Sequence, residues 1–245
     1  MEKLREQIEA LMLRLDKPDD LKAALADLSS VYPFNEYEFI ISHLLAADKL
    51  TLDEYLELRD GYVYRNLYLH LFEISAPRGF GEVWAHAHLK ELVPALLPPH
   101  KELDTGYKGQ YDFFLPPKIR IEVKASRAVE FNKDEPLYVK ALPSDSVKRF
   151  DMNFQQIKPA CCEVFVWMAA WRDVIKYWVM SAREVESNPS YSKGQHRGNV
   201  GEGQLHLNEQ NIRAFDQFLV EPRDLEKAIR DAFARQLKGN VPEPL

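Results

Sequence analysis

Asp112, Glu122 and Lys124 are the residues of this chain whose types and spacing could do chemistry. Glu122 and Lys124 are two positions apart in an apolar segment, so on a β-strand their side chains would share one face, with Ser126 next in the row. Asp112 lies in the preceding apolar segment and can face that row from a neighbouring strand. Two converging carboxylates form an oxygen-rich pocket suited to Mg²⁺, and an ammonium beside them can hold a phosphate oxygen or an attacking water. Such a group is typical of phosphodiester hydrolysis.

The Glu-x-Lys spacing is informative only through its surroundings. Charged residues make up about a quarter of ordinary sequences, so the bare spacing occurs about once by chance in a chain of this length. Here both charges interrupt the apolar segment 119–125, where burying each would cost several kcal/mol unless it is paired or ligates a metal. The alternative interpretation is a solvent-facing Glu–Lys pair on an edge strand.

A β-hairpin is predicted to bring these groups together. Residues 110–115 and 119–125 are short and rich in β-branched and aromatic residues, and Pro116-Pro117-Lys118 separates them. A helix is expected over residues 81–89, with Glu82 at its start. The hairpin would place Asp112 beside the row that contains Glu122.

Two further strands are expected downstream, at residues 163–171 and 174–181. The first is apolar almost throughout, which indicates a strand buried on both faces in the centre of a sheet. A short helix is expected near residues 152–157, and the chain closes with a helix that has Pro222 in its first turn and Gly239 past its end. This order of elements predicts an α/β (α+β) fold, in which helices flank a mixed central sheet.

Length and charge set limits on organisation and partners. The 245 residues suit one large domain with a smaller appendage, and the break at Ala76-Pro77-Arg78-Gly79 divides a helical subdomain, residues 1–76, from a main domain, residues 77–245. Hydrophobic residues make up 46%, which excludes collagen-like and disordered chains. Because 32 Lys+Arg face 38 Asp+Glu, with the acidic excess in the first 100 residues, any DNA-binding surface must be a local cleft in the C-terminal part.

The N-terminal subdomain contains a candidate DNA-binding motif. Thr51 and Glu54 have the spacing of a capping box, which starts a helix. A turn at Gly61 would make residues 51–60 and 63–73 compatible with a helix-turn-helix. The residues that its second helix would present are Arg65, Asn66, Tyr68 and His70. A helical hairpin packed on the main domain is the alternative.

Other patterns indicate the compartment. No apolar run approaches the roughly 20 residues of a membrane span, and the N-terminus is too charged for a signal peptide, so we expect a cytoplasmic protein without a membrane partner. Cys161 and Cys162 are adjacent, which excludes a disulfide framework or a four-cysteine zinc site. His86 and His88 would lie on different faces of a helix, so zinc binding is not expected there.

Residues 187–206 carry four glycines among polar side chains, and we expect them to form a long surface loop that contacts DNA. In major-groove recognition, Arg197 would read guanine, Asn199 or Gln204 would read adenine, and Lys193 would hold a phosphate. The predicted DNA-binding residues of this loop are Lys193, His196, Arg197, Asn199 and Gln204. A purely connecting loop is the alternative, and an HNH-type metal site that includes His206 is disfavoured because its flanking elements are not evident.

Gly81-Glu82 at a helix start, Tyr111-Asp112-Phe113-Phe114, and Ile121-Glu122-Val123-Lys124-Ala125-Ser126 form a characteristic series. This series resembles the PD-(D/E)xK nuclease superfamily, the fold of most type II restriction endonucleases, over about residues 79–181. The chain has Tyr111 where the family motif has Pro. It also lacks the Gln-x-x-x-Tyr signature of RecB-type relatives, since Pro159 and Ala160 stand four residues after Gln155 and Gln156.

The resemblance implies a role for each matching residue. Asp112, Glu122 and the main-chain carbonyl of Val123 would ligate Mg²⁺, for which Mn²⁺ can substitute. Lys124 would orient or deprotonate the water that attacks phosphorus, and Glu82 would add a carboxylate acting through a water molecule. The products would be a 5′-phosphate and a 3′-hydroxyl.

The expected function is therefore that of a Mg²⁺-dependent, sequence-specific DNA endonuclease, a type II restriction enzyme that acts as a homodimer on double-stranded DNA. Ser126 and Arg127, which follow Lys124, could hold DNA phosphates. One alternative is a structure- or damage-directed DNA repair nuclease of the same fold. Another is a catalytically silent DNA-binding module in which the N-terminal helices make the contacts.

Overall fold

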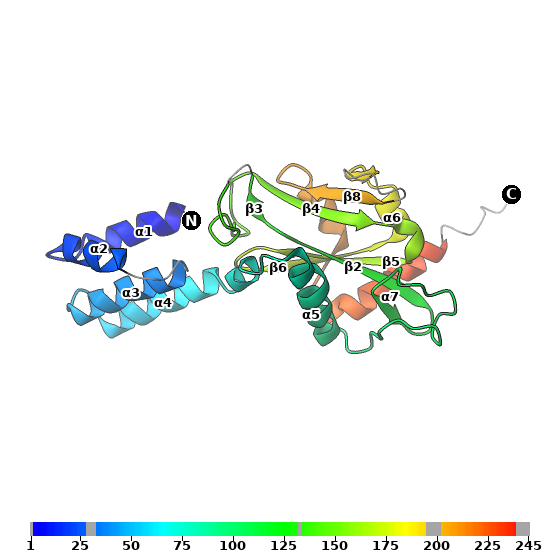
Figure 1. Ribbon diagram of the computed structural model, residues 1–245, viewed down its shortest axis with the longest axis horizontal. Helices are drawn as coiled ribbons and strands as arrows, with labels where there is room; N and C mark the ends of the chain where they lie inside the picture. Colours follow the sequence, from blue (N-terminus) through cyan, green and yellow to red (C-terminus); the bar gives the residue numbers. More distant parts are fainter. Residues whose placement is uncertain (1, 28–32, 132–133, 195–201, 239–245) are drawn as a thin grey trace.

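The computed structural model describes residues 2–27, 33–131, 134–194 and 202–238. An arm of helices extends to one side of a body that contains two β-sheets (Figure 1). The arm helices are α1 (Glu2–Met12), α2 (Pro18–Ala26), α3 (Pro33–Ala46) and α4 (Leu52–Arg65). They enclose an apolar core of their own, which includes Tyr37, Ile41 and Tyr62. The predicted N-terminal helical block is confirmed.

Helix α4 begins as predicted but does not end where expected. Thr51 and Glu54 form the capping box, because the Glu54 N–H donates to Thr51 Oγ1 and the Thr51 N–H donates to Glu54 Oε2. The predicted turn at Gly61 is wrong, since α4 continues through this glycine to Arg65. An exposed helical glycine costs about 1 kcal/mol, and the stacking of the buried Tyr62 ring on Tyr37 favours the continuous helix.

The helix-turn-helix interpretation fails for the same reason. Asn66 is the C-cap of α4, and the short 3₁₀ helix η1 (Leu69–Phe72) follows it. The Tyr68 N–H donates to the carbonyl of Arg172, 2.8 Å away in the body. The segment proposed as a recognition helix therefore connects the arm to the body.

A mixed sheet of five strands, counted over the described ranges, forms the base of the body in the order β1-β2-β5-β6-β9. Its strands are β1 (Phe113–Leu115), β2 (Ile119–Arg127), β5 (Val164–Ala170), β6 (Ile175–Ser181) and β9 (Leu219–Val220). β1 pairs antiparallel with β2, whereas β2 runs parallel to β5. β5 is buried along its whole length, so the predicted hairpin and central strand are confirmed.

A second, antiparallel sheet has the order β3-β4-β8-β7. Its strands are β3 (Val129–Glu130), β4 (Phe150–Ile157), β8 (Gly203–Leu207) and β7 (Tyr191–Lys193). Two expectations are corrected here. Residues 152–157 are a strand, not a helix, because Met152 and Phe154 alternate with less buried residues. Segment 187–206 is not one loop, because β7 and most of β8 lie within it.

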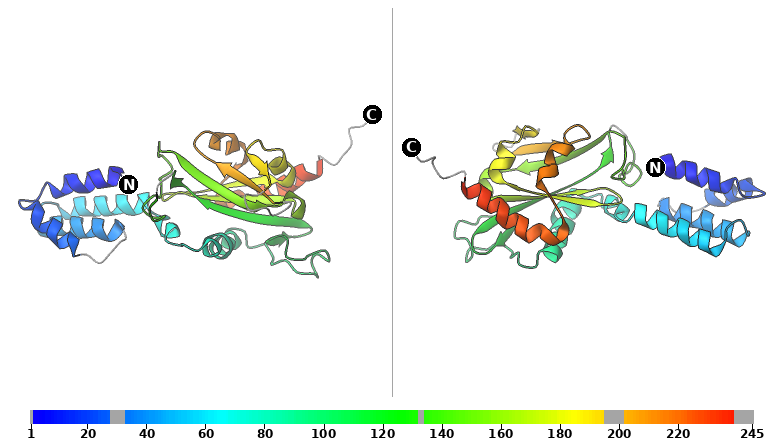
Figure 2. Two further views of the ribbon diagram at one scale, coloured as in Figure 1. Left: turned by 45° about the horizontal axis from the view of Figure 1, so that its top comes forward. Right: turned by 180° about the vertical axis from the view of Figure 1, so that it is seen from behind.

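The two sheets and the helices form layers. Helices α5 (Ala85–Leu92) and α7 (Leu225–Lys238) cover one face of the five-stranded sheet, and the second sheet covers the other (Figures 1 and 2). The shorter elements are the π-helix η2 (Gly79–Trp84), the 3₁₀ helices η3 (Pro159–Cys161), η4 (Ile212–Phe218) and η5 (Pro222–Asp224), and α6 (Ala182–Glu186). Pro222 therefore opens the 3₁₀ turn before α7, and Gly239 lies outside the described residues. Across the described ranges, no helix combines the length and apolarity needed to cross a bilayer.

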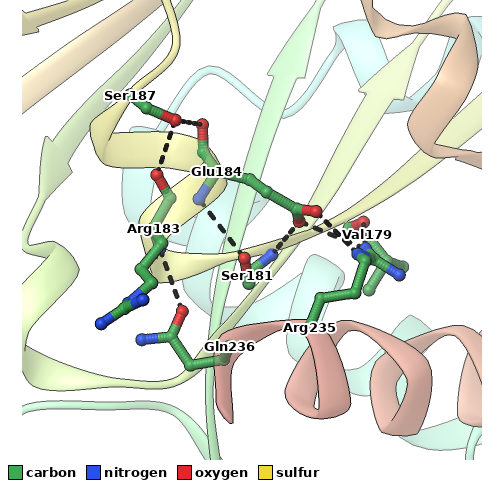
Figure 3. A network of polar contacts seen from close by, with 7 residues as sticks. All are labelled: Val179, Ser181, Arg183, Glu184, Ser187, Arg235 and Gln236. Atoms are coloured by element: carbon green, nitrogen blue, oxygen red, sulfur yellow. Dashed lines mark hydrogen bonds and ion pairs between the residues drawn. The ribbon is translucent and has the colours of Figure 1, made fainter. Parts of the chain in front are cut away.

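Polar contacts attach α7 to the end of β6 (Figure 3). Glu184 completes a capping box with Ser181 at the start of α6, and the Arg235 Nε donates to Glu184 Oε1 at 2.6 Å. One residue further along α7, the Gln236 side-chain oxygen accepts from the Arg183 N–H at 3.0 Å. One glutamate thus links a strand end, a short helix and the C-terminal helix.

Replacing Arg235 with alanine should lower the free energy of unfolding by about 1 kcal/mol at neutral pH, because both of its bonds to the partly exposed Glu184 carboxylate are lost. The pKa of Glu184 lies below its ordinary value: burial raises it, but Arg235 and the Ser181 N–H lower it more. The contribution is therefore present above the ordinary pKa of 4.5 and is lost as pH falls through the lower folded-state pKa.

Urea denaturation at several pH values would measure this effect. The matched control is Lys227→Ala, which breaks only the exposed pair with Asp231 on the same helix and should cost less than about 0.5 kcal/mol. Equal losses for the two variants would contradict the proposed attachment.

Candidate active site

The β1–β2 hairpin brings Asp112 and Glu122 together. Phe113 pairs with Ile121, and the Asp112 N–H donates to the Ile121 carbonyl at 3.0 Å. The Asp112 carboxylate turns toward β2, where its Oδ2 accepts from the Val123 N–H at 2.8 Å. Pairing between the two strands therefore fixes the backbone of this residue and its side chain.

Lys124 lies in the same row and completes the group. Its Nζ is 2.7 Å from Glu122 Oε1, and each side chain is only 16% exposed. Ile121 and Val123 point to the helix-covered face, so Glu122 and Lys124 point to the side of the second sheet. This burial rules out the alternative of a solvent-facing pair.

His86 adds a contact that was not predicted. From α5, its Nε2 lies 3.5 Å from Asp112 Oδ2, and its ring packs edge-on against Phe113. His88 points elsewhere and lies 2.6 Å from the Tyr177 hydroxyl. The available signal was spacing, because His86 is one helical turn after Glu82 and therefore shares its side of the helix.

The two carboxyl groups differ in their proton affinity. The pKa of Glu122 is raised to about 7, because burial and the negative charge of Asp112 outweigh the attraction of Lys124. Burial also raises the pKa of Asp112. The contacts with His86, the Val123 N–H and Lys124 lower it by a larger amount, so its net shift is downward. Asp112 is thus an anion at neutral pH, whereas Glu122 exchanges a proton near neutrality.

The group opens into a cleft that consists of two adjoining hollows. The larger hollow has a volume of about 660 Å³ and the smaller hollow about 440 Å³. Asp112, Glu122 and Lys124 line both. Glu82 is on the wall of the larger hollow, with 60% of its side chain exposed, 3.3 Å from Arg78. Residues able to contact a substrate or an outer-sphere water therefore surround the acidic pair.

Several residues of the two hollows were not predicted as site residues. Asn153, Gln155 and Gln156 of β4 line the larger hollow, and sequence patterns placed them on a helix. Lys158 lines the smaller hollow and is 2.7 Å from Glu202. No local motif indicates these residues, because the second sheet brings them to the site.

Arg127 does not have the DNA-contacting position that was expected. Its guanidinium donates to the carbonyls of Leu71 and Ile74 at 2.9 and 2.7 Å, and it lies over the Phe80 ring at 4.3 Å. Burial lowers its pKa to about 10. Arg127 therefore attaches the segment after the arm to β2, whereas Ser126 remains in the row of Lys124.

Of the loop residues predicted to bind DNA, the two that the structure describes, Lys193 and Gln204, lie away from the cleft. Lys193 is exposed on β7, 4.0 Å from Glu186, and Gln204 lies on β8. Neither lines the two hollows. The remaining candidates, His196, Arg197 and Asn199, lie outside the described residues. His206 of β8 is instead 3.3 Å from Asp151.

The donor set suits a hard cation. Mg²⁺ binds through one or two carboxylates and keeps several waters, which matches Asp112, Glu122 and the adjoining Val123 carbonyl. Within the described ranges, no three His, Cys, Asp or Glu side chains are grouped closely enough to hold a metal ion by themselves. The residues therefore fit a magnesium site completed by water and substrate rather than a closed protein cage.

Replacing Arg127 with methionine should lower the free energy of unfolding by about 2 to 4 kcal/mol, because two main-chain carbonyls lose their donor. Ser126→Ala, the neighbouring control, should change it by less than about 0.5 kcal/mol. Chemical denaturation would measure both, and a near-neutral Arg127→Met variant would contradict the structural role.

The free energy of unfolding should decline as pH rises through the range in which Glu122 ionises. A raised folded-state pKa contributes stability that is complete below the ordinary 4.5 and is lost as pH passes about 7. At about 1.4 kcal/mol per pKa unit, the loss is at most about 3.5 kcal/mol. Denaturation of the metal-free protein across this range, compared with Glu122→Gln, is the measurement. Parallel curves for the two proteins would contradict the assignment.

Comparison with known proteins adds no family assignment. No protein-family model matches the chain, and a search of curated proteins finds no significant match. The resemblance to PD-(D/E)xK nucleases therefore rests on the short motifs around Asp112 and Glu122.

Proposed function

We propose that this protein is a Mg²⁺-dependent DNA endonuclease of the PD-(D/E)xK type. The observation that carries the proposal is the convergence on one cleft of Asp112, which directly precedes β1, with Glu122 and Lys124 of β2. Burying two carboxylates and an ammonium in one site costs desolvation free energy. A bound cation with a phosphodiester substrate would offset that cost. The raised pKa of Glu122 has the same origin, since burial and Asp112 disfavour its charge when no cation balances it.

Each residue has a distinct task in this proposal. Asp112, Glu122 and the Val123 carbonyl hold the cation, which when bound stabilises the negative charge that develops on the phosphoryl oxygens. Lys124 donates hydrogen bonds to the attacking water or to a phosphate oxygen and so aligns them for in-line displacement. His86 acts as a positioning residue, because its contact with Asp112 limits the rotation of that carboxylate.

The overall reaction is the addition of water across one P–O bond. The water oxygen bonds to phosphorus, the bond from phosphorus to the 3′ oxygen breaks, and the 3′ oxygen gains a proton. The second proton of the water remains with the new hydroxyl on phosphorus or leaves to solvent. A 5′-phosphate and a 3′-hydroxyl result, and no oxidant or reductant is required.

The finer proposal is a type II restriction enzyme that works as a homodimer on double-stranded DNA. A two-fold dimer matches a near-palindromic site, and one active site in each subunit then cuts each strand. A structure- or damage-directed repair nuclease has the same catalytic requirements. The non-catalytic DNA-binding module loses its main support, because α4 is continuous through Gly61 and presents no second helix.

Lys124→Ala should reduce Mg²⁺-dependent DNA cleavage at least about 100-fold, the usual contribution of a positioned acid–base or charge-stabilising group. DNA affinity should fall far less than cleavage, because the substitution removes only one of the polar groups that line the cleft. Plasmid cleavage and a gel-shift assay measure the two quantities. Lys118→Ala, at an exposed turn of the same hairpin, is the matched control and should retain activity.

The cleavage products decide between the remaining functions. Discrete fragments from phage DNA support a restriction enzyme, whereas an unresolved smear favours the repair nuclease. Full activity of Lys124→Ala would refute the catalytic assignment. Binding without cleavage in both Mg²⁺ and Mn²⁺ would refute the nuclease proposal.

A further inference from the structure

The wall of the cleft opposite β2 is formed by an irregular part of β4. Phe154 pairs with Leu205 and Ile157 with Gly203, so β4 has one more residue than β8 between these two pairs. The extra residue makes a β-bulge, and Gln156 within it has a φ of +57°. This left-handed conformation is uncommon for a residue other than glycine, and bulges of this kind often redirect side chains beside active sites.

The bulge directs two neutral amides to the active-site hollows. Regular alternation would send consecutive residues to opposite faces, but both Gln155 and Gln156 are exposed and both line the larger hollow. Gln156 also lines the smaller hollow and is thus at the junction of the two, beside Glu122 and Lys124. Within the described part of the chain, β3 pairs with β4 only at Phe150 and Asp151, so β3 does not cover the edge of β4 at the two glutamines.

Asn153 supplies a second, independent observation. Asn153 lines the same hollow, and its side-chain Oδ1 is shielded from solvent without a hydrogen-bond partner among the described residues. A buried carbonyl oxygen left unpaired costs about 1 to 3 kcal/mol, so such an atom beside a cleft indicates a missing donor. Because the two ends of an amide are interchangeable by rotation, this group can offer either a donor or an acceptor to a ligand.

We propose that Asn153, Gln155 and Gln156 contact nucleobase edges next to the scissile phosphate and set the sequence preference of the enzyme. Each amide offers a donor and an acceptor on one plane, the combination that pairs with adenine, and it carries no charge. A phosphate clamp would use Lys or Arg, and an additional cation ligand would be a carboxylate. This inference rests on the proposed nuclease function and extends it to the choice of substrate.

The test is a cleavage profile on double-stranded DNA with randomised positions around the cut, in Mg²⁺. Gln155→Ala and Gln156→Gly should each reduce discrimination at one position beside the cut by about tenfold, a typical value for one amide–base pair. Glycine is chosen at position 156 because it accepts the positive φ, so the fold is kept while the side chain is removed. The rate constant on the least preferred sequences should change less than threefold, which separates preference from catalysis.

Gln217→Ala is the matched control, since this exposed glutamine lies outside both hollows. A profile unchanged in both bulge variants, while the wild type cuts with a defined preference, would overturn the inference and leave the nuclease function intact. A uniform loss of rate on all sequences would also overturn it, because it would make the amides part of catalysis. Failure of the wild type to cut DNA would refute the proposed function itself.

Discussion

The enclosure of two carboxylates in one poorly solvated site is the constraint on which this structure depends. Like charges at contact distance are stable only when other groups compensate for them, and here Lys124, His86 and the Val123 N–H do so in part. The compensation is unequal. Asp112 has a lowered pKa and is held as an anion, whereas the pKa of Glu122 is raised to about 7, close to neutral pH. A site built in this way favours any cation that can replace the missing positive charge.

The remainder of the body holds this arrangement rigid. β2, which carries Glu122 and Lys124, pairs with the fully buried β5 over residues 121–127, and β1 pairs with its first three residues, 119–121. Arg127 continues this support at the end of the strand by attaching the segment that leads to the arm. The functional groups are therefore on a strand, where pairing limits their displacement, and the second sheet supplies the opposite wall.

The row of polar side chains on β2 could be predicted from the sequence because it depends on local rules. Strand periodicity placed Glu122, Lys124 and Ser126 on one face, and the same parity puts Arg127 on the other face, a signal that the DNA-binding prediction overlooked. β4 could not be recognised, because the bulge places Ile157 three residues after Phe154 and imitates helical spacing. Gly61 was read as a turn, although contacts distant in sequence hold α4 continuous. Cleft residues from β4 depend on sheet packing, which no local pattern encodes.

The path of the chain at Ala128 links the buried interior to the cleft lined by Asp112 and Glu122. β2 leaves the first sheet there, and β3 enters the second sheet one residue later, so both layers share one uninterrupted stretch of backbone. Between the layers lie large aromatic side chains, with Phe154 edge-on to Trp167 at 5.2 Å between ring centroids. The thickness of this aromatic filling therefore sets the separation of the two sheets, and buried residues that do not line the cleft help to define its width.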